Sequence, residues 1–471
     1  MQICSRLCNQ DESLALTGLH YTGAVLVFSL ITIVGLYSGK KVKNASDFNS
    51  GSGKSGAGVV VGAIVGTVVG GASTIGTAQL AFYYGLSAWW FTLGSGLGFV
   101  VMLLFFCGPI YKNGIVTLPQ IFSKEYGEKA GITATVLNSV GSFLSVVVQI
   151  LSGVALISAV SHIGPVAAMA IMVVLIFVYV VFGGIWGTGY VGIAKTILIY
   201  AATGLCGILA LVLQGGPGVF MYSLPTERYF NLFARGFVLD GGAALSLVLG
   251  TLTTQIYIQT LLMARTLEAA KKGVLISAII LPLAGVGGIL VGFYMKLNYP
   301  EIIPGAALPL FILLKTPPLL AGITLAALLV ALVGTGAGMI LGISTMITNN
   351  IYKAYFGKKA SGTKELFVNR LCIVLILVIA AVFSAGNIGT LILGWSFLSM
   401  GLRGVVGFGP LCTALFLPGR IRPVYVQISM ILGITLVILG RYILPPYVDS
   451  LFLGVAGSLL VLAIGLTVDH K

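Results

Sequence analysis

The sequence predicts an all-α integral membrane protein with 13 transmembrane helices, arranged as a single membrane domain over residues 1-471. Charged residues make up 8% of the chain and hydrophobic residues 58%, whereas about a quarter of a soluble domain is charged. A helix that spans a bilayer needs about 20 mainly apolar residues. Thirteen such runs follow one another here, and no polar stretch between them is long enough for a second domain.

Apolar runs bounded by charged residues, proline or glycine define the thirteen spans. Residues 1-18 are polar and lack the basic start and small-residue cleavage site of a signal peptide, so we expect the first run to remain as a helix. In chain order the predicted spans are 20-38, 57-83, 87-110, 131-161, 164-183, 187-214, 240-264, 273-296, 318-350, 366-384, 387-417, 423-441 and 450-468.

Basic residues distinguish the two faces of this domain. The chain has 26 Lys and Arg against 12 Asp and Glu, and all but two of the basic residues lie in or beside the short segments between spans. Of these, 18 fall on one side and 6 on the other. The positive-inside rule then predicts a multi-pass protein of the plasma or inner membrane, with its N-terminus outside and its C-terminus in the cytosol. The excess positive charge therefore indicates topology rather than binding of nucleic acid.

Enzyme and pump chemistry has little support in the sequence. Four of the six cysteines lie inside apolar runs, and no histidine lies near the other two to complete a metal set. We find no nucleophile–base pair and no glycine loop for phosphate, which disfavours an enzyme or an ATP-driven pump. We therefore expect no organic cofactor, and we identify no obligate protein partner besides the lipid bilayer.

Span 2 carries glycines and polar side chains at a depth where hydrocarbon offers no hydrogen-bond partner. Its middle reads Gly70-Gly71-Ala72-Ser73-Thr74-Ile75-Gly76-Thr77-Ala78-Gln79. A helix broken here would present free carbonyls to a cation and free N–H groups to an anionic ligand. The alternative interpretation is that these small residues only allow close helix packing.

Span 7 has a similar polar interruption, formed by Gly250, Thr251, Thr253, Thr254, Gln255 and Gln259. Two interrupted helices five spans apart fit two inverted repeats, spans 2-6 and 7-11, with a binding site between them near the bilayer midplane. The core would then cover about residues 56-418. Spans 1, 12 and 13, at about 20-38, 423-441 and 450-468, would be peripheral. Helix packing alone does not predict this spacing.

Span 9 places Ala331, Gly334, Thr335 and Gly338 on one helix face. A hydroxyl group together with free carbonyls suits a small hard cation without a carboxylate. The alternative is that the threonine hydroxyl bonds back to its own helix.

At these residues the chain resembles the sodium:solute symporter family, to which the sodium/proline and sodium/glucose cotransporters belong. The resemblance covers nearly the whole chain and rests on the order of several short motifs. Besides the thirteen-span layout and the stretch in span 2, these are Thr117-Leu118-Pro119-Gln120 leading to Tyr126-Gly127, Gly183-Gly184, Arg265-Thr266 with Ala269-Ala270-Lys271, and Ile351-Tyr352-Lys353.

The resemblance implies a principal sodium site and a solute site beside it. Carried over by position, the ion ligands are Ala72, Ile75, Ala331, Gly334 and Thr335. The solute site would lie beside Gln79 and the polar run of span 7, and we include in it Ser73, Thr74, Thr253, Thr254 and Gln255.

Two departures from the family pattern bear on the ions. Many members have two adjacent hydroxyl residues where this chain has Gly334 and Thr335, so one ligand is missing. Gly192 and Lys195 stand where many members have an Asp and a Gln, and the Asp helps to form a second sodium site in some of them. The resemblance therefore does not imply a second sodium site here.

Lys195 lies about eight residues into span 6, about 12 Å along the helix. An unpaired lysine at that depth is costly. One interpretation is that its long side chain extends back toward the cytosol. The other is that its ammonium replaces the sodium ion and exchanges a proton during the cycle, as a lysine does in some sodium-independent relatives of the same fold.

Arg403 is the second cation inside a span. It either pairs with helix carbonyls or water, or it clamps a substrate carboxylate in a bidentate manner. Two buried cations without a buried anion favour an anionic or zwitterionic solute. A sugar is disfavoured, because the acidic residue that sugar-transporting relatives carry in the third span has no counterpart between Trp89 and Cys107.

The sequence thus predicts a secondary active transporter that works by alternating access. Sodium-coupled symport of a small organic solute, a carboxylate or zwitterion rather than a sugar, is the first hypothesis. Proton-coupled or sodium-independent transport with Lys195 in place of sodium is the alternative. A channel or a non-transporting sensor is a more remote class, since the outer halves of spans 2 and 9 are too apolar for a continuous polar path.

Overall fold

A computed structural model describes residues 16–39, 53, 55–114, 117–161, 163–356 and 362–468, apart from the side chains of 182–190 and a few others within helices. The described residues are 87% helical and contain no strand. The elements are α2 (Gly18–Gly39), α4 (Ala57–Val68), η3 (Ala72–Gly76), α5 (Thr77–Tyr84), η4 (Gly85–Trp89), α6 (Trp90–Val101), η5 (Met102–Phe106), α7 (Cys107–Asn113), α8 (Leu118–Tyr126), α9 (Glu128–Ser161), α10 (Pro165–Gln214), α11 (Pro217–Ser223), α12 (Thr226–Tyr229), α13 (Phe237–Thr253), α14 (Gln255–Met263), α15 (Leu267–Ile280), η6 (Leu281–Gly285), α16 (Val286–Asn298), η7 (Pro304–Ala306), α17 (Ala307–Lys315), α18 (Pro318–Ile347), η8 (Thr348–Tyr352), α19 (Lys353–Phe356), α20 (Gly362–Ala385), α21 (Ile392–Phe416), α22 (Pro423–Ile443) and α23 (Leu451–Val468).

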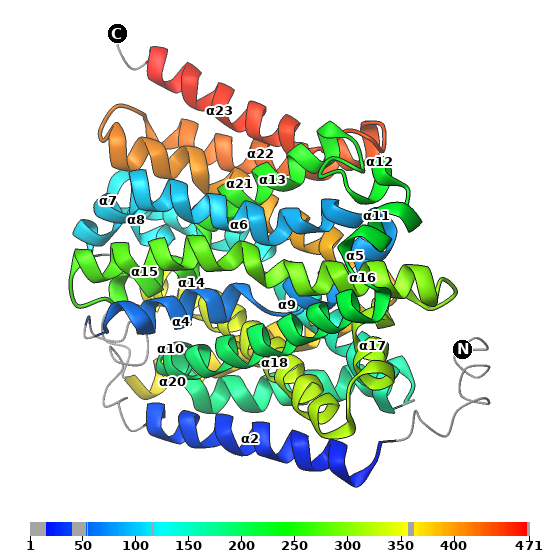
Figure 1. Cartoon of the computed structure of the whole chain (residues 1–471). Coiled ribbons are helices and arrows are strands. Elements are labelled where there is room, and N and C mark those ends of the chain that lie inside the picture. Colours follow the sequence, from blue (N-terminus) through cyan, green and yellow to red (C-terminus); the bar gives the residue numbers. More distant parts are fainter. Residues whose placement is uncertain are drawn as a thin grey trace.

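The long helices lie side by side in one bundle, with α2 at one edge and α22 and α23 at the opposite edge (Figure 1). Helices α9, α18 and α21 are the most enclosed, whereas α2, α20 and α23 present most of their surface outward. Any site built on α9, α18 and α21 is therefore shielded from lipid by the rest of the bundle.

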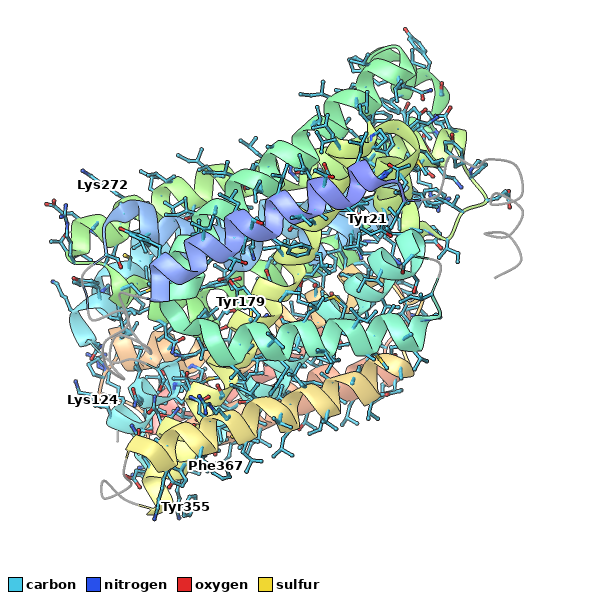
Figure 2. The ribbon with its side chains drawn as sticks, turned by 90° about the horizontal axis from the view of Figure 1, so that it is seen from below. Tyr21, Lys124, Tyr179, Lys272, Tyr355 and Phe367 are labelled. Atoms are coloured by element: carbon cyan, nitrogen blue, oxygen red, sulfur yellow. The ribbon has the colours of Figure 1, made fainter. Side chains whose placement is uncertain are left out.

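Two lysines that the sequence assigns to the cytosolic side lie at one end of the bundle. Figure 2 shows Lys124 and Lys272 at one end and Tyr21 at the other. Helix α2 begins at the end opposite to that where α23 finishes (Figure 1). We call the end near Tyr21 the predicted outer face. The termini themselves, 1–15 and 469–471, lie outside the described residues, and the orientation in the membrane stays a prediction.

The described chain holds ten helices long and apolar enough to cross a membrane, or eleven if the bent pair α13–α14 counts as one span. Three predicted spans are divided differently from the sequence prediction. Helix α4 has only 12 residues because span 2 is interrupted, and α10 runs through predicted spans 5 and 6. The count of thirteen and the five-plus-five repeat therefore stay predictions.

Span 2 is interrupted between α4 and η3. Helix α4 ends at Val68, and Val69 adopts an extended backbone with φ −82° and ψ 99°. Gly70 and Gly71 follow before the π-helical turn η3 begins. There is no room for a side chain at Gly70, because a Cβ there would lie 2.6 Å from the Thr335 hydroxyl oxygen and 2.8 Å from Gln149 Oε1. The glycines thus allow the break to lie against two neighbouring helices.

Span 7 is interrupted at Thr254. This residue has φ −78° and ψ 118° between α13 and α14, and the two helices meet at an angle of 47°. The Thr254 hydroxyl donates to the Gly250 carbonyl, one of the acceptors that the end of α13 leaves free. Both interruptions predicted from the sequence are therefore present in the structure.

Close glycine contacts join α4 to α10. A Cβ at Gly66 would lie 2.7 Å from Gly192 Cα, and a Cβ at Gly192 would overlap the Gly62 carbonyl oxygen. The position where many family members carry an aspartate is therefore filled by helix backbone. An acidic side chain does not fit there without separating the two helices.

We expect Gly192→Ala to lower the melting temperature of the purified protein by about 5 °C, because overpacking costs about 1–3 kcal/mol. Gly204→Ala on the same helix is the matched control, since a Cβ at Gly204 meets no atom within 4 Å. Fluorescence-detected size exclusion after heating measures both. Equal melting temperatures for the two variants would contradict the destabilisation expected from the α4–α10 contact.

Candidate functional site

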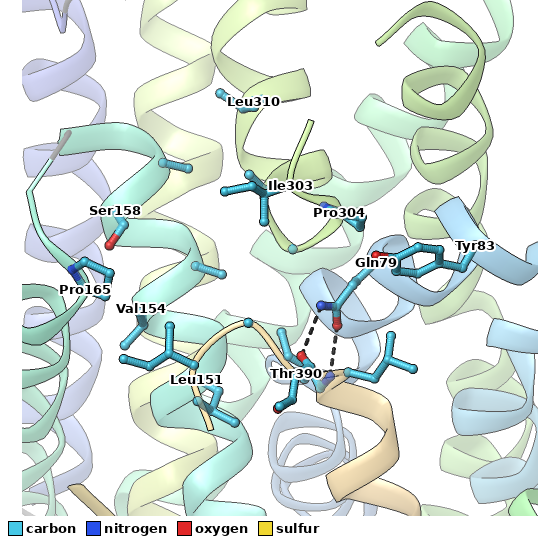
Figure 3. Close-up of a pocket in the computed structure, with 18 of the residues that line it drawn as sticks. Gln79, Tyr83, Leu151, Val154, Ser158, Pro165, Ile303, Pro304, Leu310 and Thr390 are labelled. Atoms are coloured by element: carbon cyan, nitrogen blue, oxygen red, sulfur yellow. Dashed lines mark hydrogen bonds between the residues drawn. The ribbon is translucent and has the colours of Figure 1, made fainter. Parts of the chain in front are cut away.

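A cavity of about 880 Å³ opens near the predicted outer face. It is lined by α5, the outer half of α9, the start of α10, the η7–α17 segment and residues 388–392. Figure 3 shows Leu151, Val154, Ile303 and Leu310 around it, with Gln79 and Ser158 among the polar residues. The lining residues carry no formal charge. The cavity therefore has mainly apolar walls.

Gln79 closes the floor of this cavity. Its Nε2 donates to the Thr390 carbonyl at 3.2 Å, and its Oε1 accepts from the Ile392 N–H at 2.9 Å (Figure 3). A Cβ at Gly305 would lie 3.5 Å from Gln79 Nε2. One amide thus joins α5 to the start of α21 beneath the cavity. Of the residues that the sequence assigns to the solute site, Gln79 is the one that lines it.

Lys195 lies in a buried site against α18. Its Nζ donates to the Thr335 hydroxyl at 2.9 Å and to the Ala331 carbonyl at 3.2 Å. A Cβ at Gly334 would lie 3.4 Å from the same Nζ. The ammonium therefore contacts two of the five predicted ion ligands and lies beside a third. One interpretation of the sequence was that this side chain extends toward the cytosol. The structure shows that it does not.

Thr335 faces the end of α4 rather than the turn that follows it. Its hydroxyl oxygen lies 3.5 Å from the Gly66 carbonyl and 3.4 Å from the Val69 carbonyl. The Ala72 carbonyl instead accepts from the Thr77 hydroxyl at 3.0 Å, and Ile75 is buried in the same π-helical turn. The structure thus brings Ala331, Gly334 and Thr335 to Lys195, and it places the Thr335 hydroxyl beside the Gly66 and Val69 carbonyls of span 2. No sequence signal distinguished these two.

Arg403 is fully buried between four helices. Its guanidinium donates to the Thr254 hydroxyl at 2.8 Å, the Ser145 hydroxyl at 2.9 Å and the Ser399 carbonyl at 3.1 Å. The thioether sulfurs of Met400 and Met339 lie at 3.0 and 3.9 Å. Arg403 does not line the outer cavity. Neutral dipoles and sulfur atoms therefore surround this cation, and no acidic residue of the described chain contacts it.

The remaining predicted solute residues occupy separate positions. Ser73 and Thr74 both bond to Gly70 of their own break. Thr253 bonds back to the Leu249 carbonyl. Gln255 lies toward the other end, where its Oε1 accepts from the Leu118 N–H at 2.8 Å. The structure thus does not gather the predicted solute residues into one pocket.

The Gln255–Leu118 contact helps to close the end opposite the cavity. Nearby, the Thr117 hydroxyl donates to Asn350 Oδ1 at 3.2 Å. These two bonds connect α8 to α14 and to η8. The molecule is therefore open at the predicted outer face and closed at the predicted cytosolic face.

A polar face on α9 is part of the site and was missed in the sequence. Its buried residues are Asn138, Ser142, Ser145, Gln149 and Ser152. Their alternating spacing of four and three residues places them on one side of a helix. This spacing of polar residues in an otherwise apolar span is the sequence pattern from which the polar face could have been predicted. Gln149 Oε1 accepts from the Gly71 N–H at 2.8 Å, directly at the first helix break.

Two helices interrupted at mid-depth, a cavity open to one face and a buried cation between the helices define the class of secondary transporters with discontinuous helices. The chain belongs to the sodium:solute symporter family, whose model matches residues 50–393. Members of this family are transporters rather than enzymes, as the choline and proline transporters among its relatives illustrate.

Two relatives illustrate the extent of the match. The high-affinity proline transporter of Bacillus subtilis is 23% identical over 466 residues, which cover 91% of this chain and 93% of that protein. The high-affinity choline transporter 1 of Drosophila melanogaster is 23% identical over 390 residues, 76% of this chain. The match spans 61% of the length of the fly protein.

The fold is that of a solved sodium-coupled sialic acid symporter in a substrate-bound, outward-open state. The TM-score is 0.81 at 18% identity, over 96% of this chain and 97% of that chain. The structure of MhsT in complex with L-phenylalanine aligns more distantly, with a TM-score of 0.54. The all-helical transporter fold predicted from the sequence is thereby shown.

Proposed function

We propose that this chain is a secondary active transporter that moves a small organic solute across the membrane by alternating access. The observation that carries the proposal is a cavity at the predicted outer face, above two interrupted helices. At the predicted cytosolic face the bundle is closed. An outward-open state of this kind admits solute from one side only. The whole of residues 1-471 would act as one transporter domain, with 13 spans and a five-plus-five repeat core.

We assign the cation function of the core first to Lys195. Its two bonds to Ala331 and Thr335 support this, because a sodium ion held by the same oxygen atoms would lie within a few ångströms of the ammonium. Gly334 supports it too, since the missing side chain leaves space beside Nζ. Under this assignment the protein is sodium-independent, and Lys195 binds and releases a proton during the transport cycle.

Sodium-coupled symport is the second candidate, favoured by family membership and by the sodium-coupled structural neighbour. Here the ion would use the predicted ligands Ala72, Ile75, Ala331, Gly334 and Thr335 after Lys195 has lost its proton or moved away. The chain's own chemistry toward sodium is limited to carbonyls and one hydroxyl, because Gly334 supplies no second hydroxyl.

For the solute we keep the preference for a carboxylate or zwitterion over a sugar. Lys195 and Arg403 bring two positive charges into the core, and among the described residues the fully enclosed acid is Asp240, which pairs with Arg235 instead. A solute carboxylate would compensate this imbalance. Gln79, at the floor of the cavity, would be the first polar group to meet it.

Uptake into proteoliposomes tests the function. Labelled L-proline, choline, sialic acid, short carboxylates and glucose are supplied under a sodium gradient, a proton gradient or neither. We expect saturable uptake and counterflow of one anionic or zwitterionic compound, driven without sodium. Uptake that requires sodium would establish the second candidate instead. Large unitary currents without counterflow would show a channel and overturn both.

A further inference from the structure

Each helix break leaves several backbone groups without their helical partners, and one group at each break is bonded by a neighbouring helix instead. In an uninterrupted helix the Gly71 N–H would bond the carbonyl of Thr67, four residues earlier. The extended backbone at Val69 removes that partner. At the second break, the Thr253 carbonyl would accept from the Tyr257 N–H. That N–H bonds the Thr254 carbonyl instead.

Both of these groups are bonded by side chains of the same helix, α9. Gln149 Oε1 accepts from the Gly71 N–H at 2.8 Å, and Asn138 Nδ2 donates to the Thr253 carbonyl at 3.2 Å. One break needs an acceptor and the other a donor, and α9 supplies each. Both carboxamides are buried. A buried backbone group without a partner is costly, so these bonds matter most in the closed interior.

Between the two carboxamides, α9 also reaches the buried arginine. Ser145 lies one turn from Gln149 and accepts from Arg403 at 2.9 Å, and Gln149 Nε2 lies 3.5 Å from the Ser145 carbonyl. Asn138 and Gln149 are eleven residues apart, about 16 Å along the helix. One rigid face thus touches the first break, Arg403 and the second break. Helix α9 lies in the middle of the bundle (Figure 1).

We propose that Asn138 and Gln149 are positioning residues which hold the two helix breaks against α9 and thereby stabilise the outward-open arrangement. The inference rests on the proposed alternating-access function. Movement of either break relative to α9 must exchange these hydrogen bonds. Removing one of them therefore raises the population of the inward-open arrangement.

The test measures that population without any solute. Thr345, buried on the predicted cytosolic part of α18, is replaced by cysteine in the full chain. A maleimide reagent then labels it in detergent, and mass spectrometry of the peptide gives the rate. Labelling requires the closed end to open. The parent is expected to react slowly.

Gln149→Met and Asn138→Leu should each raise the labelling rate about threefold to tenfold, in line with the loss of one hydrogen bond. The two increases should multiply in the double variant, because both bonds act on one equilibrium. Gln149→Glu keeps an acceptor for the Gly71 N–H and should stay within twofold of the parent. If Gln149→Met does not fold, Asn138→Leu alone tests the claim at the other break.

Thr135→Val is the matched control on α9. Its hydroxyl is also buried, but it bonds only to the Gly131 carbonyl of its own helix. A rate for Asn138→Leu within twofold of the parent, or an equal rise for Thr135→Val, overturns the inference. Failure of every uptake assay with an intact labelling result would instead remove the transport proposal and leave the role of α9 standing.

Discussion

Lys195→Gln combined with Gly334→Ser is expected to make transport sodium-dependent, with uptake about tenfold or more faster in saturating sodium, because the variant loses a repulsion of about 5 kcal/mol. That figure holds for two unit charges about 3 Å apart at an effective dielectric constant of about 20. In the parent, Nζ bonds Ala331 and Thr335. Removing the ammonium frees both oxygen atoms for an ion, and the second substitution adds a hydroxyl beside them.

Sodium itself is the simplest probe for this double variant. Sodium chloride, compared with potassium chloride at equal ionic strength, should raise the melting temperature of the variant and leave the parent unchanged, since a ligand that binds only the folded state stabilises it. Lys195→Gln with Gly338→Ser is the matched control, because Gly338 faces Thr67 one turn away. A sodium-dependent shift in the parent would refute the assignment of Lys195 to the ion's place.

The sequence predicted the parts of the site that depend on position along a single helix. The depth of Lys195 in its span, the glycines of span 2 and the polar run of span 7 were all visible as departures from an apolar pattern. Both interruptions followed from them. Membership of the family, read from short motifs, was confirmed by the family model.

The parts that depend on contacts between helices were not predictable in the same way. The sequence assigned both Gln79 and Gln255 to the solute site, and nothing in it indicated that Gln79 lines the cavity whereas Gln255 bonds to α8. The partners of Arg403 come from four helices, and no residue spacing along the chain predicts these contacts between helices. The packing of Gly192 against Gly62 depends on the approach of two helix backbones. Only the polar face of α9 carried a usable pattern that was overlooked.

Arg403→Met is expected to leave the protein folded and to reduce uptake about a hundredfold or more, equivalent to about 2.7 kcal/mol. The hydroxyl groups around the guanidinium keep other partners when it is removed: Ser399 bonds Gly141 and Ser145, and Thr254 bonds Gly250. Methionine fills a similar volume beside Met339 and Met400. Replacing a buried charge by an apolar side chain of similar size is often neutral or stabilising.

The positive charge of Arg403 would then serve to bind the solute and not to stabilise the fold. Melting temperature and uptake of the solute identified in proteoliposomes separate the two roles of Arg403. A melting temperature within about 3 °C of the parent together with lost uptake supports a carboxylate as the missing counter-charge. A large fall in the melting temperature, with uptake reduced only in proportion to the folded fraction, would show that Arg403 is a structural link between α9, α13 and α21 and would remove the argument for an anionic solute.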